Sequence, residues 1–286
     1  MNRIDELKRN LRLLAPHGIA LAFSGGVDST FLLSVLKELH DETPFPLLAL
    51  TMHTVFQPDD ETEAAKRQTA EFGVEAEVFT CDPLALPEVR SNPPDRCYWC
   101  KRKIFRTFLD VCRARRLAHL LDGTNADDGH AYRPGRRALK ELGVLSPLAS
   151  LGFTKQEIRE LSAERGLPTA TNPSMPCLAT RFEYGAELTP ERIAQVGRGE
   201  AFLRTLLPET ADLRSETPES HFRDPCADPR LRASHSSASM ISRIVCIERS
   251  TDAISSAHCF NSPLIIAACP ISFLCFSWCS RLAQKS

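Results

Sequence analysis

The sequence has almost no net charge and no long apolar leader. Lys and Arg together number 35 against 36 Asp and Glu, which gives a formal net charge of −1. No global electrostatic field steers the chain to nucleic acid or to anionic membrane, so neither partner is expected. Residues 1–14 (MNRIDELKRNLRLL) lack the apolar core of a secretion signal and have the pattern of an amphipathic helix, so we expect a cytoplasmic protein.

Glycine is missing from the C-terminal part of the chain. All 13 glycines lie between Gly18 and Gly199, although folded domains need glycine for tight turns and helix ends. Residues 209–257 show neither helical nor strand periodicity. Two interpretations of this tail stay open: a divergent, loosely folded extension, or a shifted reading frame that replaced the native C-terminus. Its apolar stretch, 263–278, is shorter than the roughly 20 residues of a membrane span, so a membrane anchor is not favoured.

The first 208 residues alternate between short apolar segments and helical patterns. Strands are expected at 19–23, 46–53, 74–80 and 117–123. Helices are expected at 61–72, 101–117 and 154–166, and again from residue 189. Strands that alternate with helices predict an α/β fold, in which a parallel twisted sheet has helices on both faces. Ligands of such folds bind beyond the carboxyl ends of the strands.

Two adjacent glycines follow the first expected strand, in the segment SGGVDS (24–29). Its candidate phosphate-binding residues are Ser24, Gly25, Gly26, Asp28 and Ser29. The glycines allow a tight turn whose N–H groups face an anion, and the next helix adds positive charge at its start. A carboxylate does not favour a bare anion, so Asp28 would hold Mg²⁺ or orient the loop. The loop has no lysine, which disfavours γ-phosphoryl transfer, and a Gly-Gly turn with a Ser or Asp cap is the structural alternative.

This loop resembles the PP-loop of the ATP pyrophosphatase superfamily, whose members split ATP between the α- and β-phosphates and adenylylate an oxygen of the substrate. Three later segments narrow the resemblance: 92–105 (NPPDRCYWCKRKIF), 122–136 (DGTNADDGHAYRPGR) and 173–185 (PSMPCLATRFEYG). Over residues 4–206 they resemble the LarE-type ATP-dependent sulfur transferases, which build the nickel-pincer nucleotide cofactor of lactate racemase. The resemblance implies the adenine nucleotide alpha hydrolase-like PP-loop fold, with ATP and Mg²⁺ as cofactors.

The resemblance also implies a domain organisation. Residues 1–170 would form the PP-loop ATP-binding α/β domain, and 171–208 the sulfur-donor segment with the first helix of a C-terminal domain. Residues 209–286 depart from the family, whose members continue with a basic strand of the R-V-R-x-H type. None of the Arg, Asp and Glu residues expected there can be placed on the tail. The resemblance implies a homo-oligomer, but the family's subunit-contact residues lie in the segment that the tail does not match.

The resemblance implies a small-molecule substrate, a pyridinium dicarboxylate mononucleotide. One of its carboxylates would be adenylylated, and sulfur would then replace AMP to leave a thiocarboxylate. Arg133 and Arg181 are candidates for the substrate phosphate, with a surface ion pair as the alternative for each. Asn125, Asp127 and Asp128 follow the fourth expected strand, where ATP groups or a second metal would lie, and an Asx-rich turn is the alternative.

Three cysteines bear on the source of sulfur. In the simplest members of the resembled family, a cysteine matching Cys177 gives up its own sulfur and becomes dehydroalanine. Other members have two further cysteines, matching Cys97 and Cys100, and hold an iron–sulfur cluster. All three are present here, so a [4Fe–4S] cluster with one iron open to sulfide is the favoured prediction. A zinc site, a redox pair at Cys97 and Cys100, and a single sacrificial Cys177 stay open.

Other functions also stay open at this point. A tRNA-thiolating PP-loop enzyme uses the same adenylylation, but the near-neutral charge gives it no support. An amide-forming synthetase would not need Cys97, Cys100 and Cys177. A non-catalytic, ATP-binding remnant is the interpretation that the glycine-free tail favours.

Overall fold

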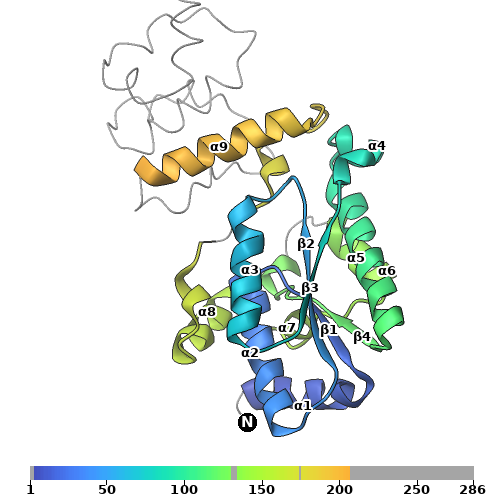
Figure 1. Cartoon of the computed structure of the whole chain (residues 1–286), viewed down its shortest axis with the longest axis vertical. Coiled ribbons are helices and arrows are strands. Elements are labelled where there is room, and N and C mark those ends of the chain that lie inside the picture. The colour runs from blue at the N-terminus through green and yellow to red at the C-terminus, as the bar shows by residue number, and fades with distance from the viewer. Residues whose placement is uncertain (1–2, 130–133, 174, 207–286) are drawn as a thin grey trace, which may run out of the picture. The chain divides into compact units, whose positions relative to one another are not determined.

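The structure is a computed structural model that describes residues 3–129, 134–173 and 175–206 (Figure 1). The described residues belong to one compact unit, Met1–Leu213. The predictions made for the tail, 209–286, and for Arg133 concern residues outside the described part.

The centre of the fold is a parallel sheet of four strands, as the alternating pattern predicts. The strands are β1 (Ile19–Ala22), β2 (Leu47–His53), β3 (Ala76–Thr80) and β4 (His119–Leu121), in the order β3-β2-β1-β4. Ile19 is paired with Leu47 on one side and with His119 on the other. The chain runs outward from β1 to β3 and then returns to place β4 on the other side of β1. The strand order therefore reverses at β1, and α/β folds bind ligands at the carboxyl end of such a position.

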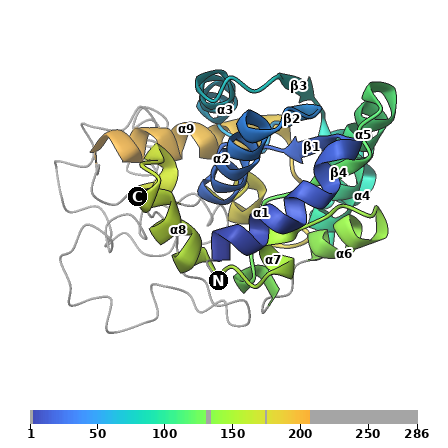
Figure 2. The same cartoon turned by 90° about the horizontal axis from the view of Figure 1, so that it is seen from below.

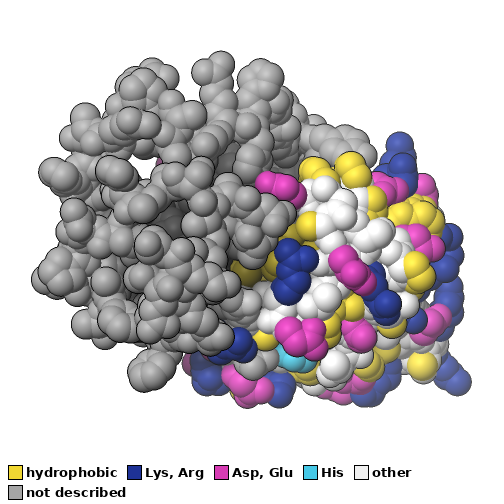
Figure 3. Space-filling model, turned by 90° about the horizontal axis from the view of Figure 1, so that it is seen from above, with side chains coloured by type: hydrophobic (Ala, Val, Ile, Leu, Met, Phe, Trp, Pro, Cys, Tyr) yellow, Lys and Arg dark blue, Asp and Glu magenta, His cyan; other side chains and the backbone are white. Residues whose placement is uncertain are grey.

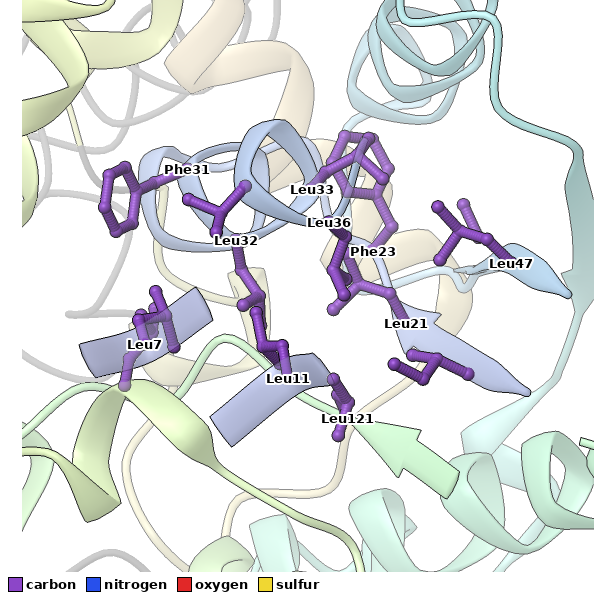
Figure 4. Close-up of a cluster of buried hydrophobic side chains, with 14 of the residues drawn as sticks. Leu7, Leu11, Leu21, Phe23, Phe31, Leu32, Leu33, Leu36, Leu47 and Leu121 are labelled. Atoms are coloured by element: carbon purple, nitrogen blue, oxygen red, sulfur yellow. The ribbon is translucent and has the colours of Figure 1, made fainter. Parts of the chain in front are cut away.

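Helices cover both faces of the sheet, as predicted, and one face is the larger core. It packs against α1 (Arg3–Leu14), α2 (Val27–Glu42), α7 (Pro147–Ser150) and α8 (Lys155–Glu164). Figure 4 shows Leu7 and Leu11 of α1 beneath Leu32 of α2, with Leu21 of β1 alongside. Each such side chain is fully buried, which contributes roughly 1.5–3 kcal/mol to folding.

The opposite face packs against α5 (Arg96–Arg115) and α6 (Pro134–Glu141). Phe105 and Phe108 of α5 belong to a second apolar cluster together with Leu48 and Leu50 of β2. Figure 2 shows α2 and α3 (Asp59–Glu71) on one side of the strands and α5 and α6 on the other. Among the described helices, none combines the length and apolar character that crossing a membrane requires.

A third apolar cluster joins the donor segment to the rest of the unit. It combines Leu178, Leu188 and Ile193 with Phe56, which follows β2, and Val89. Val89 belongs to α4 (Pro87–Arg90), and Ile193 belongs to α9 (Pro190–Leu206), which runs across the top of Figure 1. The cluster spans the boundary expected between residues 170 and 171, which stays a prediction. Short 3-10 helices complete the described elements: η1 (Ala15–His17), η2 (Pro83–Ala85), η3 (Asp127–Gly129), η4 (Pro168–Thr171) and η5 (Leu178–Arg181).

One helix boundary was predicted wrongly. The helix expected at 101–117 begins at Arg96 and ends at Arg115, so the two cysteines of the C-x-x-C pair lie in its first turns. Cys, Tyr and Trp are weak helix formers, which hides the true start in the sequence. Burial of Arg96 and Tyr98 overrides that weak local preference.

Local signals set other helix ends correctly. Thr154 and Glu157 form the predicted capping box at the start of α8. Gly73 and Gly166, which were expected to end two helices, both have the left-handed backbone that favours glycine.

Candidate functional site

The SGGVDS loop connects β1 to α2 at the point where the strand order reverses. Gly25 has a φ of +74°, and a Cβ there would lie 3.4 Å from Ala65 of α3, so a residue with a side chain would be strained. The hydroxyl oxygens of Ser24 and Ser29 are 3.1 Å apart, and Ser29 also donates to the Gly26 carbonyl at 3.1 Å. The loop therefore places two hydroxyls beside the N–H groups of a helix start, an arrangement that suits phosphate.

An ion pair joins this loop to α8. The Lys155 Nζ lies 2.6 Å from Oδ2 of Asp28, and the two side chains are 28% and 20% exposed. The backbone N–H of Lys155 also donates to Oδ2 of Asp127, at 2.7 Å. Lys155 thus supplies the cation that the loop itself lacks. Sequence reasoning missed it because 127 positions separate the partners, although its place directly after the capping residue Thr154 is a local signal.

The predicted Asn125, Asp127 and Asp128 lie beside the loop. The side-chain amide of Asn125 is 3.5 Å from Oδ1 of Asp28, the outer limit for a hydrogen bond. Asn125 and Asp128 bond to each other's backbone N–H groups, both at 3.3 Å, which is the Asx-type turn that was the alternative. A Cβ on Gly123 would lie 3.0 Å from the backbone nitrogen of Ser29, so this segment packs directly on the start of α2. Asn125 consequently lies next to Asp28, and Asp127 accepts from Lys155, the ion-pair partner of Asp28. Asp28 is a carboxylate of the kind that Mg²⁺ prefers.

The three cysteines of the predicted donor site come from two distant segments. Cys97 and Cys100 lie three positions apart in the first turns of α5, and Cys177 directly precedes η5. The N–H of Leu178 donates to the Phe56 carbonyl at 2.9 Å, and Phe56 lies three residues beyond the end of β2. Because β1 and β2 are parallel neighbours, Cys177 is attached to the same edge of the sheet as the SGGVDS loop.

Two of the three thiols, Cys100 and Cys177, have a raised pKa. Burial raises the pKa of Cys100 to about 12, and the nearby Cys177 and Cys97 add to the increase. Burial also raises the pKa of Cys177, while the Arg96 guanidinium partly opposes the increase. Cys100 and Cys177 also pack against the same apolar cluster, so the structure brings these two together as neutral thiols at pH 7.

Comparison with known proteins places this architecture in a family. The PP-loop domain family matches residues 2–86. A pyridinium-3,5-bisthiocarboxylic acid mononucleotide synthase from Lactiplantibacillus plantarum is 31% identical over 188 residues, covering 66% of this chain and 67% of the relative. The chain belongs to the LarE-type family of PP-loop enzymes. An uncharacterized Synechocystis protein is 39% identical over 196 residues, covering 68% of this chain and 72% of the relative. An uncharacterized protein from Methanocaldococcus jannaschii is 29% identical over 205 residues, covering 71% of this chain and 77% of the relative.

In this LarE-type protein, Arg181 pairs with a carboxylate of the same segment. Its Nε contacts Glu200 of α9, and its Nη1 donates to Oγ1 of Thr180 at 3.0 Å. This is the ion-pair alternative that the sequence left open, so the phosphate role of Arg181 stays a prediction. Arg133, the other candidate, lies outside the described residues.

The cysteines of this LarE-type protein are the residue type that binds iron–sulfur clusters, but the described structure does not arrange them as a metal site. Thiols are the donors that iron–sulfur clusters use, and Cys97, Cys100 and Cys177 would supply three of them. Over the described ranges, however, no three His, Cys, Asp or Glu side chains form a group that could hold a metal ion. The [4Fe–4S] cluster, and the zinc alternative with it, therefore stay predictions.

The surface on the α9 side has mixed charge. In Figure 3 the described part of this face shows Lys and Arg side chains interspersed with Asp and Glu, in keeping with the formal net charge of −1. No patch of one sign dominates the described atoms of that view.

Proposed function

We propose that this protein is an ATP-dependent sulfur transferase. It adenylylates a carboxylate of a pyridinium dicarboxylate mononucleotide and replaces AMP with sulfur to give a thiocarboxylate. The observation that carries the proposal is the hydrogen bond from Leu178 to the Phe56 carbonyl, which attaches the Cys177 segment to the edge of the sheet where the SGGVDS loop lies. The synthase from L. plantarum, whose name states this class of product, supports the choice of substrate.

Adenylylation needs pyrophosphate to leave from ATP. The substrate carboxylate attacks the α-phosphorus, the bond to the β-phosphate oxygen breaks, and an acyl-adenylate forms. The N–H groups of the SGGVDS loop and the Lys155 ammonium bind the phosphates and neutralise the charge that develops on the leaving pyrophosphate. Mg²⁺, when bound, would be held by Asp28 and would add to this charge neutralisation. Asn125 and Asp127 keep Asp28 and Lys155 in place.

Sulfur then displaces AMP from the acyl-adenylate. In one form of the proposal, the Cys177 sulfur attacks the acyl carbon and AMP leaves, which gives a thioester. Removal of the Cys177 Cα proton by a base then breaks the Cβ–S bond, leaving dehydroalanine at 177 and the thiocarboxylate product. In the other form, Cys97, Cys100 and Cys177 would hold a [4Fe–4S] cluster, which would supply a sulfide that can be replenished.

The test measures phosphate products, iron and the mass of Cys177 in one anaerobic preparation. With the dicarboxylate mononucleotide and ATP, we expect release of pyrophosphate and none of ADP. Cys177→Ser abolishes thiocarboxylate formation, whereas Cys112→Ala, which removes a buried thiol of α5 from the second apolar cluster, keeps it. Iron and sulfide in the protein with an unchanged Cys177 support the cluster form, and dehydroalanine at 177 without iron supports the sacrificial form. ATP binding without turnover would identify a non-catalytic remnant and refute the proposal.

A further inference from the structure

Arg96 is a buried cation without a carboxylate partner. Its residue is 4% exposed, and no described carboxylate forms an ion pair with it. Its Nη1 donates to the Ala179 carbonyl at 3.0 Å and to Oδ1 of Asn92, and its Nη2 lies 3.7 Å from the Cys97 sulfur. Burying a guanidinium is costly unless acceptors surround its N–H groups. In the described structure its acceptors are Oδ1 of Asn92, the Ala179 carbonyl beyond Cys177 and the sulfur of Cys97, and the last two belong to the donor site.

Asn92 extends the same network along the donor segment. The residue is fully buried and has a φ of +49°, an uncommon backbone that asparagine tolerates better than most side chains. Its side-chain amide donates to the carbonyls of Phe182 and Glu183, at 3.4 and 2.6 Å, and its own carbonyl accepts the Gly185 N–H at 2.9 Å. Arg96 and Asn92 therefore hold four backbone groups between residues 179 and 185.

We propose that Arg96 and Asn92 are positioning residues for sulfur transfer, because together they fix the segment that contains Cys177 against Cys97 and Cys100. The planar guanidinium bonds the Ala179 carbonyl and contacts the Cys97 sulfur at once, so it sets the separation of the two cysteine segments. Lysine has no such planar fork and cannot reproduce both contacts in one geometry. The inference rests on the proposed function, since it assigns the two residues to the sulfur step of that reaction.

Arg96 and Asn92, which we call the clamp, hold different parts of the donor segment. Arg96 connects α5 to the start of the donor segment, close to Cys177, whereas Asn92 holds the end of the segment near Gly185. Neither residue contacts the SGGVDS loop, Asp28 or Lys155 in the described structure. Loss of the clamp should therefore leave adenylylation intact and slow only the step that needs Cys177 in place. Misplacing a reacting group by about 1 Å can cost roughly 100-fold in rate.

The first experiment needs no activity and uses the full-length protein, free of iron. Diamide oxidises pairs of neighbouring thiols to disulfides and is itself reduced to the hydrazine. Peptide mass spectrometry then measures the initial rate at which Cys177 forms a disulfide with Cys97 or Cys100. This rate is divided by the rate at which iodoacetamide alkylates Cys177, which gives a normalised linking rate. We expect wild-type protein to form the link, and Arg96→Met and Asn92→Gly to lower the normalised rate at least tenfold. Arg106→Met, which changes an exposed arginine of the same helix, should leave it within twofold.

Asn92→Gly is the decisive variant, because glycine keeps the positive φ and the change touches neither a thiol nor a charge. Both variants should keep a cooperative thermal transition and the wild-type KM for ATP in pyrophosphate release. Thiocarboxylate formation should fall at least tenfold. An unchanged linking rate in Asn92→Gly, or loss of the folded state in both variants, overturns the proposal. If wild-type protein releases no pyrophosphate, the proposed function fails, while the linking rates still decide the role of the clamp.

Discussion

Replacing Lys155 by methionine removes the cation that the structure places beside the phosphate-binding loop. The Nζ is 2.6 Å from Asp28 in the unliganded protein, within reach of any phosphate that the loop holds. A hydrogen bond from a charged donor contributes about 1.5–3 kcal/mol. At about 1.4 kcal/mol for each factor of ten, Lys155→Met should weaken ATP binding roughly 10- to 100-fold. The loss should be larger for ATP than for adenosine, because only ATP has the phosphates.

Isothermal titration calorimetry with ATP and with adenosine measures this difference directly. Lys155→Arg keeps a cation at the same position and should retain most of the affinity. Lys66→Met removes an exposed lysine of α3, whose partner Glu63 lies 2.7 Å away, and should change nothing. An ATP affinity of Lys155→Met within twofold of the wild type would refute the assignment and leave Lys155 as a structural partner of Asp28. Unfolding should be affected little, by about 1 kcal/mol or less, because both side chains keep some contact with water.

Three further outcomes test other parts of the structure. Thr154→Ala removes the capping box of α8 and should lower the free energy of unfolding by about 1 kcal/mol, measured by urea denaturation. Gly25→Ala places a side chain at a φ of +74° and should abolish ATP binding measured by calorimetry while the far-ultraviolet circular dichroism stays unchanged. Burial first, and then His17, lowers the pKa of His119 below its ordinary value of 6.5. As the pH falls, the unfolded chain therefore binds a proton at His119 before the folded protein does, so stability is lost as the pH falls through 6.5. His119→Gln removes this proton site and should make the urea midpoints between pH 7 and 5.5 less pH-dependent.

The sequence was sufficient for features that depend on neighbouring residues. The strands were found from their apolar runs, the α8 start from Thr154 and Glu157, and two helix ends from Gly73 and Gly166. Each of these signals acts within a few residues of the position that it sets. The rule that crossovers are right-handed determines only part of the strand order. The sequence alone does not say whether β4 pairs with the free side of β1 or with the free side of β3.

Long-range contacts account for what the sequence did not show. Lys155 reaches Asp28 across 127 positions, and Arg96 reaches the Ala179 carbonyl across 83. A lysine or an arginine near the start of a helix gives no sequence signal of such a role, since both residue types are common there and mostly exposed. Their partners distinguish them, Asp28 for Lys155 and the Ala179 carbonyl for Arg96, and these partners are brought near only in the folded chain. The resemblance to a family found Cys177 and the C-x-x-C pair, but it did not show what holds them.

The arrangement of the strands explains why the two long-range contacts matter together. The reversal of strand order at β1 opens the carboxyl edge of the sheet, where the SGGVDS loop begins α2. The segment from α7 to α8 approaches this edge and adds Lys155, and the segment after η4 approaches it through Phe56 and adds Cys177. In the proposed function, phosphate binding and sulfur delivery would thus depend on different connections to one edge of the sheet. Changes at Lys155 should therefore impair the first step without the second, and changes at Asn92 should do the reverse.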